Sequence, residues 1–143
     1  MTEVIRVVVP GRPPNLANAR LHWRKRADLV RERKEHVWAH AMVLPPAKRP
    51  TADGPRRAEA TVYLSGVPMD QDNLTAALKC DLDALASPRP GATPRQAGLK
   101  ACLIIDDDPQ HLEVTVRQVR CKHRWEQRVE WAISKPDDRR TIE

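Results

Sequence analysis

The chain has 143 residues, of which 41% are hydrophobic and 31% are charged. This length supports one domain with a core, and no apolar run approaches the roughly 20 residues that a membrane-spanning helix needs. The first residues lack the basic start and long apolar stretch of a secretory signal, so we expect a cytoplasmic protein without membrane contact.

The net charge of +6 indicates an anionic partner, and its distribution is uneven. Residues 1–69 carry 13 Lys and Arg against 6 Asp and Glu, residues 70–113 carry 4 against 8, and residues 114–143 carry 8 against 5. Basic segments attract a polyanion, whereas an acidic centre repels it unless a cation is bound there. This pattern favours a metal-dependent enzyme that acts on nucleic acid.

We expect the chain to begin with a β-strand over residues 4–9, because this stretch is rich in β-branched residues. A helix is predicted over residues 24–43 from the spacing of its apolar side chains, and Pro45 ends it. After a proline-rich connector, residues 58–64 are predicted to form a second strand.

A basic cluster surrounds one tryptophan near the start of the first helix. The candidate DNA contacts are Arg12, Arg20, Trp23, Arg24, Lys25 and Arg26. Such a cluster can hold phosphates while the aromatic ring stacks on a base or sugar. The alternative, which the sequence leaves equally open, is a solvated helix start with Trp23 packed against the core.

Two aspartates, Asp70 and Asp72, stand at the start of a helical pattern that extends to Leu85. Asp72 or Asn73 is predicted to be the N-cap, because its side chain can accept from the free N–H groups of the first turn. Close carboxylates repel each other, and a divalent cation between them removes the repulsion. The alternative is that one aspartate caps the helix and the other is a solvated turn residue.

Lys79 and Asp83 are predicted to project from the same helix face as Asp72, away from the apolar stripe. Side chains on a helix lean toward its N-terminus, so Lys79 leans back toward Asp70 and Asp72. This arrangement predicts an exposed line of acidic and basic groups along one helix.

The loop at residues 87–98 is predicted to lack regular structure, because it holds three prolines and two glycines. Its two arginines make it a candidate substrate-contacting loop, although most such loops are connectors. A strand is then predicted over residues 99–108, with Asp106 and Asp107 on opposite faces. Two more strands are expected at residues 112–119 and 129–133.

If the two acidic clusters converge, three carboxylates form a site for Mg²⁺ or Mn²⁺ that supports phosphodiester hydrolysis. Lys79 would add positive charge toward the transition state. The three cysteines include no Cys-x-x-Cys pair, which argues against a zinc site, and Cys80 and Cys102 are expected to be buried thiols.

Three pieces of the sequence resemble the RusA-type Holliday-junction resolvases, a family common in bacteriophages and prophages. They are PGRPPNLANARLHW at residues 10–23, Asp-x-Asp-Asn-Leu leading to Lys79 and Asp83-Ala84-Leu85, and the Asp pair that closes IIDDD. The lysine lies one helical turn further from Asp72 than in the best-known bacterial form, and the loop at residues 87–98 is longer than the family pattern.

The resemblance implies a compact α+β fold with a small mixed sheet and two main helices in residues 1–134, followed by a flexible tail at 135–143. It implies a homodimeric, Mg²⁺-dependent endonuclease that cuts four-way DNA junctions symmetrically. Asp70, Asp72 and Asp107 match the metal-binding carboxylates and Lys79 matches the catalytic lysine, while Asp106 remains an alternative to Asp107.

Two other functions compete with this one. The first is a non-catalytic DNA-binding module in which the carboxylates are structural and the basic segments bind the backbone. The second is an enzyme acting on nucleotides or nucleotide sugars, since Asp-x-Asp also binds metal–diphosphate complexes. The absence of a glycine-rich phosphate loop after a strand argues against that second alternative.

Overall fold

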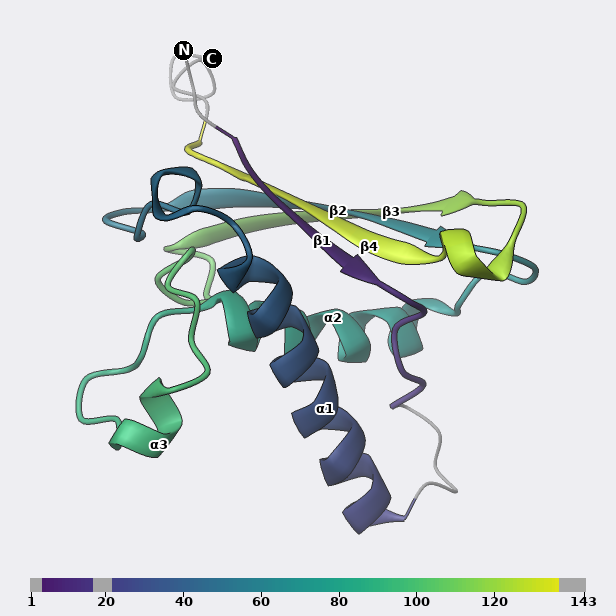
Figure 1. Cartoon of the computed structure of the whole chain (residues 1–143), viewed down its shortest axis with the longest axis horizontal. Helices are drawn as coiled ribbons and strands as arrows, with labels where there is room; N and C mark the ends of the chain where they lie inside the picture. Colours follow the sequence, from purple (N-terminus) through teal and green to yellow (C-terminus); the bar gives the residue numbers. More distant parts are fainter. Residues whose placement is uncertain (1–3, 17–21, 137–143) are drawn as a thin grey trace.

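The computed structural model describes residues 4–16 and 22–136, without the side chains of residues 96 and 97. Figure 1 shows an α+β fold in which one sheet lies against two long helices on a single face. The predicted fold class, a small mixed sheet with two main helices, is thus confirmed. No helix in the described ranges is both long and apolar enough to cross a bilayer.

The sheet has four strands in the order β1-β4-β2-β3. They are β1 (Ile5–Pro10), β2 (Arg56–Leu64), β3 (Leu112–Arg120) and β4 (Arg128–Ser134). Strand β4 is antiparallel to both β1 and β2, whereas β2 and β3 are parallel. A parallel pair needs a long crossover, and the chain between β2 and β3 contains the second long helix.

The long helices are α1 (Trp23–Met42) and α2 (Gln71–Leu85). Shorter pieces are α3 (Pro94–Ala97) and the 3₁₀ turns η1 (Pro46–Lys48) and η2 (Arg124–Glu126). Each predicted strand at residues 4–9, 58–64, 112–119 and 129–133 is present within two residues of its expected ends. The loop at 87–98 was expected to be irregular throughout, but it contains the single turn α3.

The core lies between the helices and one face of the sheet. Buried and less buried residues alternate along β1, β2 and β4, as a strand with one covered face requires. Trp131 of β4 is among the largest fully buried side chains, and Leu74, Leu78 and Leu85 carry the apolar stripe of α2 into the same core. Burial of this apolar surface is the main force that holds α2 against the sheet.

A buried polar group joins both helices to the sheet. Arg33 of α1 donates to the two carboxylate oxygens of Asp81 on α2, at 2.6 and 2.8 Å. The indole Nε1 of Trp131 donates to the same carboxylate at 2.9 Å. Since Asp81 thereby points inward, the neighbouring positions two residues away on α2 face outward.

The predicted strand over residues 99–108 is wrong. This segment makes one isolated bridge, between Ala86 and Ile104, and the N–H groups of Ala101 and Leu103 donate to carbonyls of Ala84 and Leu85 at the end of α2. Cys102 has a φ of 60°, which interrupts an extended conformation, and it is partly exposed rather than buried. The segment therefore caps a helix whose last carbonyls lack partners within the helix.

Candidate functional site

The first aspartate pair lies at the N-terminus of α2, but with roles that differ from the prediction. Asp70, rather than Asp72 or Asn73, is the N-cap, and its Oδ1 accepts from the backbone N–H of Asp72 at 2.9 Å. Its Oδ2 accepts from Nδ2 of Asn73 at 2.9 Å. Asp72 is exposed in the first turn, so one aspartate has a structural role and the other faces solvent.

The start of α2 is attached to β3 by a pair of side-chain hydrogen bonds. The amide of Gln118 accepts from the N–H of Met69 at 3.0 Å and donates to the carbonyl of Met69 at 2.9 Å. This pairing resembles a strand ladder and holds the residue before Asp70 in place. The position of both aspartates is therefore set relative to the sheet.

Asp107 lies beside α2. A hollow of about 290 Å³ between α2 and β3 has both Lys79 and Asp107 in its wall. The other lining residues are Gln71, Leu74, Thr75, Leu78, Leu82, Val114 and Val116. The hollow extends from the first turn of α2 past its middle, and Asp107 stands on the same side of the molecule as that face of the helix.

The surroundings of Asp107 disfavour its ionised form. Its pKa is raised above the ordinary Asp value, first by burial, then by a side-chain hydrogen bond with Asp106 and by the negative charges of Asp106 and Asp83. Lys79 acts in the opposite direction and lowers the pKa. Asp83, Asp106 and Asp107 thus form an acidic group next to Lys79, which we call the acidic triplet.

The three consecutive aspartates have different surroundings. Asp106 accepts from the N–H of Asp107 at 2.8 Å and lies 3.9 Å from Nε of Arg89, in the wall of a separate cavity. Asp108 accepts from the ring of His111 at 2.7 Å and from a backbone N–H of the following turn. Of the three, Asp107 is the one that shares a hollow with Lys79, which favours it over Asp106 as the third site residue.

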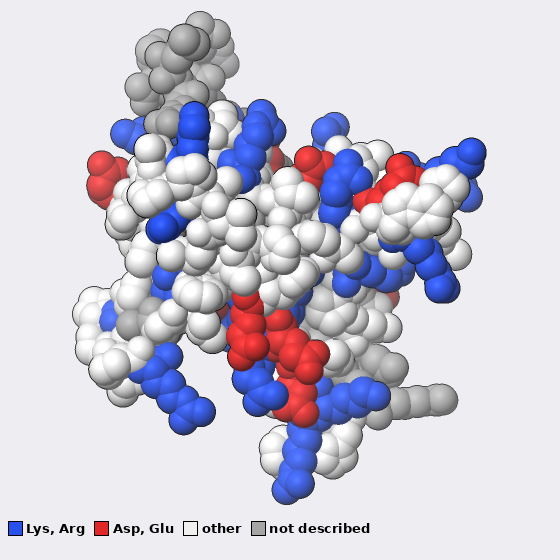
Figure 2. Space-filling model, viewed as in Figure 1, with Lys and Arg blue, Asp and Glu red and all other residues white. Residues whose placement is uncertain are grey.

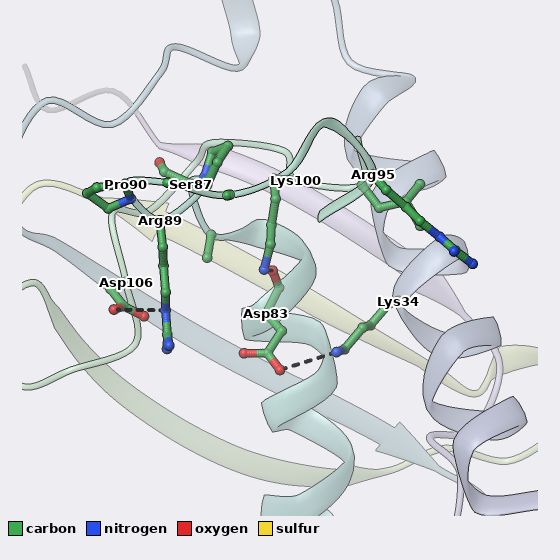
Figure 3. A pocket seen from close by; sticks show the side chains of 13 residues that line it. Lys34, Asp83, Ser87, Arg89, Pro90, Arg95, Lys100 and Asp106 are labelled. Atoms are coloured by element: carbon green, nitrogen blue, oxygen red, sulfur yellow. Dashed lines mark hydrogen bonds and ion pairs between the residues drawn. The ribbon is translucent and has the colours of Figure 1, made fainter. Parts of the chain in front are cut away.

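The separate cavity has a volume of about 570 Å³ and lies between α1, the C-terminal end of α2 and the loop at residues 87–98. Figure 3 shows Lys34, Arg89 and Lys100 extending toward Asp83 and Asp106. Nζ of Lys34 lies 3.5 Å from the Asp83 carboxylate, and Nζ of Lys100 donates to the Asp83 backbone carbonyl at 2.8 Å. We call this space the loop cavity.

No three His, Cys, Asp or Glu side chains are arranged to hold a metal ion among residues 4–16 and 22–136. Asp70, Asp72 and Asp107 therefore do not form a ready-made cage. The donors nevertheless have the chemistry that Mg²⁺ prefers, and this ion usually takes one or two carboxylates, water and substrate phosphates. The repulsion that raises the pKa of Asp107 would be relieved by such a cation.

The predicted basic cluster lies at the end of α1 that extends away from the sheet (Figure 1). Trp23 is 67% exposed with the Arg24 guanidinium 5.1 Å from its ring centroid, so packing of this ring on the core is excluded. Lys25 is exposed, and Arg26 donates to the carbonyl of Leu16. Figure 2 shows acidic side chains gathered over α1, with Lys and Arg side chains around them.

The other two predicted DNA contacts are placed differently. Arg12 is exposed and donates to the side chain of Gln127 at 3.5 Å, next to the start of β4. Arg20 lies outside the described residues, as do residues 137–143 of the predicted tail. The structure thus leaves Arg12 and the cluster around Trp23 accessible.

A second exposed tryptophan was not predicted as a contact. Trp125 of η2 is 79% exposed and stacks on His123, with ring centroids 4.1 Å apart and planes 8° from parallel. Residues 117–128 carry five Lys and Arg against one Glu. Basic residues around an aromatic are the pattern that identified Trp23, so the same pattern in the sequence could have identified Trp125.

The comparisons with known proteins leave the family open. No protein-family model matches the chain, and no curated protein matches it at a significant level. The residues of the site and the resemblance of the motifs are therefore the basis for inferring a function.

Proposed function

We propose that this chain is a Mg²⁺-dependent endonuclease that resolves four-way DNA junctions, as the resemblance to RusA-type resolvases implies. The observation that carries the proposal is the position of Asp107, which shares a hollow with Lys79 of α2 and has a raised pKa. A carboxylate perturbed by burial and by like charges in a concave site is typical of functional positions. The net charge of +6 suits a DNA substrate.

In this proposal Asp70, Asp72 and Asp107 contribute the protein ligands of Mg²⁺, or of Mn²⁺ in its place. The ion, when bound, supplies an activated water and offsets negative charge on the phosphodiester oxygens. Asp72 and Asp107 have carboxylates that no helix cap uses, whereas Asp70 must serve the cap of α2 as well. Asp70 therefore contributes chiefly by fixing the first turn of α2.

Lys79 has two roles in this proposal. Its charge favours the ionised form of Asp107, as the direction of its effect on the pKa indicates. It also offers an ammonium group to a phosphate that enters the hollow, because its side chain is exposed at the wall. Positive charge placed before the reaction begins stabilises the charge that develops on the phosphate.

We further propose a cytoplasmic homodimer, with the catalytic domain in residues 1–134. Symmetric cutting of two strands requires two active sites related by a two-fold axis. Each chain would then supply one active site, with Asp70, Asp72, Asp107 and Lys79, and one set of basic contacts from Arg12 and the residues around Trp23.

Cleavage of a synthetic four-way junction tests this function. We expect Asp72→Asn and Asp107→Asn each to reduce the cleavage rate by about 100-fold or more with Mg²⁺, since each removes a charge from the reacting centre. Junction binding in EDTA should be retained or become tighter. Asp28→Asn, on the exposed face of α1, is the matched control and should cleave normally.

Asp70→Asn separates capping from charge, because Asn is as good an N-cap as Asp. We expect Asp70→Asn to be as stable as the wild type. Its cleavage rate should fall only to the extent that the charge of Asp70 holds the ion in the wild type. Normal cleavage by both Asp72→Asn and Asp107→Asn would contradict the nuclease proposal.

A non-catalytic DNA-binding module is the second candidate, and one observation favours it. Asp70, Asp106 and Asp108 each accept a hydrogen bond from a backbone N–H group, as structural carboxylates do. This candidate predicts tight, salt-dependent binding with no nicks in several junction sequences, with either Mg²⁺ or Mn²⁺ present. The cleavage assay above distinguishes the two.

A further inference from the structure

Four cationic side chains from three separate parts of the chain line the loop cavity. Lys34 comes from α1, Arg89 and Arg95 come from the loop at residues 87–98, and Lys100 follows that loop. Asp83 and Asp106 are the two carboxylates in the wall. The cations thus outnumber the anions by two, which leaves the cavity suited to an anionic ligand.

The existing ion pairs are loose enough to be replaced. Lys34 and Asp83 are 3.5 Å apart, and Arg89 and Asp106 are 3.9 Å apart with the Arg89 side chain 80% exposed. Arg95 makes no ion pair with any described residue and stands apart from the other cations in Figure 3. Exposed pairs of this kind contribute little stability, so a phosphate can compete for the guanidinium groups.

The wall of the loop cavity is held by specific contacts. The hydroxyl of Ser87 donates to the carbonyl of Ile104 at 2.8 Å at the start of the loop. At its end, the ammonium of Lys100 donates to the carbonyl of Asp83 at 2.8 Å. Pro88, Pro90 and Leu99 add apolar surface beside the cations. The volume of about 570 Å³ lies within the range of about 300–1,000 Å³ usual for small-ligand sites.

The loop cavity also adjoins the proposed site of cleavage. It shares Asp83 and Asp106 with the acidic triplet, and Asp107 follows directly in the neighbouring hollow. Because the consecutive residues Asp106 and Asp107 line the two spaces, a DNA strand whose phosphate meets Lys79 and Asp107 passes beside the loop cavity. Cations for the phosphate and apolar surface for the sugar and base are both present there.

We propose that the loop cavity binds the nucleotide next to the scissile phosphodiester, with Arg89 and Arg95 holding its phosphates. That the neighbouring phosphodiester is the one cleaved rests on the proposed function, but binding of a nucleotide in the loop cavity does not require cleavage. It assigns a substrate-binding role to the loop at residues 87–98, which the sequence leaves open between contact and connector.

Binding of a fluorescent four-way junction in EDTA, measured over a range of salt concentrations, tests the proposal without cleavage. Each phosphate contact contributes about 0.9 to the slope of log K against log salt. We expect Arg89→Gln/Arg95→Gln to reduce that slope by about 1.8. The control with the same charge change, Arg6→Gln/Arg31→Gln, replaces exposed arginines of β1 and α1 and should change it by less than half as much.

Arg89→Lys/Arg95→Lys should restore most of the slope, because the charges return, and circular dichroism verifies that each variant is folded. A slope for the Gln double variant equal to that of its control would overturn the proposal. If wild-type protein does not cleave but the slope falls as expected, the nuclease proposal fails and the binding site stands. If wild-type protein cleaves junctions and the slope is unaffected, the nuclease proposal stands and the binding-site proposal fails.

Discussion

Arg33 and Asp81 form a bidentate ion pair buried between α1 and α2, with Nε–Oδ1 and Nη2–Oδ2 distances of 2.6 and 2.8 Å. Successive residues on a helix are about 100° apart, so residues two positions from an inward-facing one lie on roughly the opposite face. Asp81 points inward to Arg33 and Trp131, and Lys79 and Asp83 are therefore turned toward the hollow and the loop cavity.

Replacement of Asp81 with Asn should destabilise the fold strongly. The change keeps the shape of the side chain but leaves the Arg33 charge buried without its partner, which costs about 3–5 kcal/mol in the free energy of unfolding. Urea denaturation measures this difference. Asp28→Asn breaks the exposed Arg31–Asp28 pair and should change the free energy by less than about 1 kcal/mol. Equal losses in the two variants would contradict a structural role for Asp81.

The sequence predicts the helices and the strands of the sheet well because their patterns are local. The strand predicted over residues 99–108 fails for a non-local reason: its apolar residues contact the end of α2, and its N–H groups bind the carbonyls of Ala84 and Leu85. Nothing in the segment itself indicates that helix carbonyls, rather than a neighbouring strand, are its partners. The left-handed backbone of Cys102 is equally invisible, since the residue is not Gly.

In the candidate site too, features set by local patterns follow from the sequence, whereas features set by contacts between distant segments do not. Helical periodicity correctly places Lys79 on an outward face of α2, where Asp107 lines the same hollow. The meeting of Asp107 with Asp70 and Asp72 in one metal site stays a prediction. The loop cavity was not predicted because Lys34 and Lys100 belong to segments that meet only in the folded chain. The choice of Asp70 as N-cap was missed because Asp70, Asp72 and Asn73 are all good caps by type.

Thiol labelling should separate the three cysteines. Burial, followed by the negative charge of Asp81, raises the pKa of the Cys80 thiol, and the reactive species is the thiolate. Cys102 and Cys121 are partly exposed. We expect a disulfide reagent to modify two thiols of the native protein quickly and the third only after denaturant is added. Cys80→Ser should leave the number of thiols in the fast phase unchanged; a loss of one thiol from that phase would show that Cys80 is accessible.

The raised pKa of Asp107 predicts a pH-dependent stability of definite sign. The folded state holds this proton more tightly than the unfolded chain, whose value is near 3.8, so the contribution is favourable below that pH. It is lost as the pH rises through the raised pKa. Asp107→Asn should lack this loss and be more stable than wild type at pH 7. Urea denaturation between pH 4 and pH 7 measures the difference, and a less stable variant at neutral pH would contradict it.

Removal of the Lys79 charge should raise the pKa of Asp107 further, because Lys79 is the group that opposes its neighbours. Carbon-detected NMR titration of the aspartate carboxyls reports this change in the Lys79→Gln variant. Lys48→Gln, in the turn η1 outside both hollows, is the matched control and should leave the titration of Asp107 unchanged. An unaltered midpoint in Lys79→Gln would show that the ammonium does not act on this carboxylate.

Mg²⁺ should stabilise the folded protein through Asp107, independently of any DNA. A ligand that binds only the native state adds about 2.7 kcal/mol when its concentration is 100 times its Kd, which raises the melting temperature measurably. Thermal unfolding with increasing Mg²⁺ should therefore shift upward for the wild type and much less for Asp107→Asn, while Asp28→Asn follows the wild type. Because Asp107→Asn already removes the repulsion with Asp83 and Asp106, its melting temperature in EDTA should equal or exceed that of the wild type.

If neither Mg²⁺ nor Mn²⁺ changes the melting temperature of the wild type, the carboxylates bind a cation only when phosphate oxygens complete the site. Repeating the titration with a junction bound to the protein would then show the shift, and its absence there too would leave Asp70, Asp72 and Asp107 without a metal.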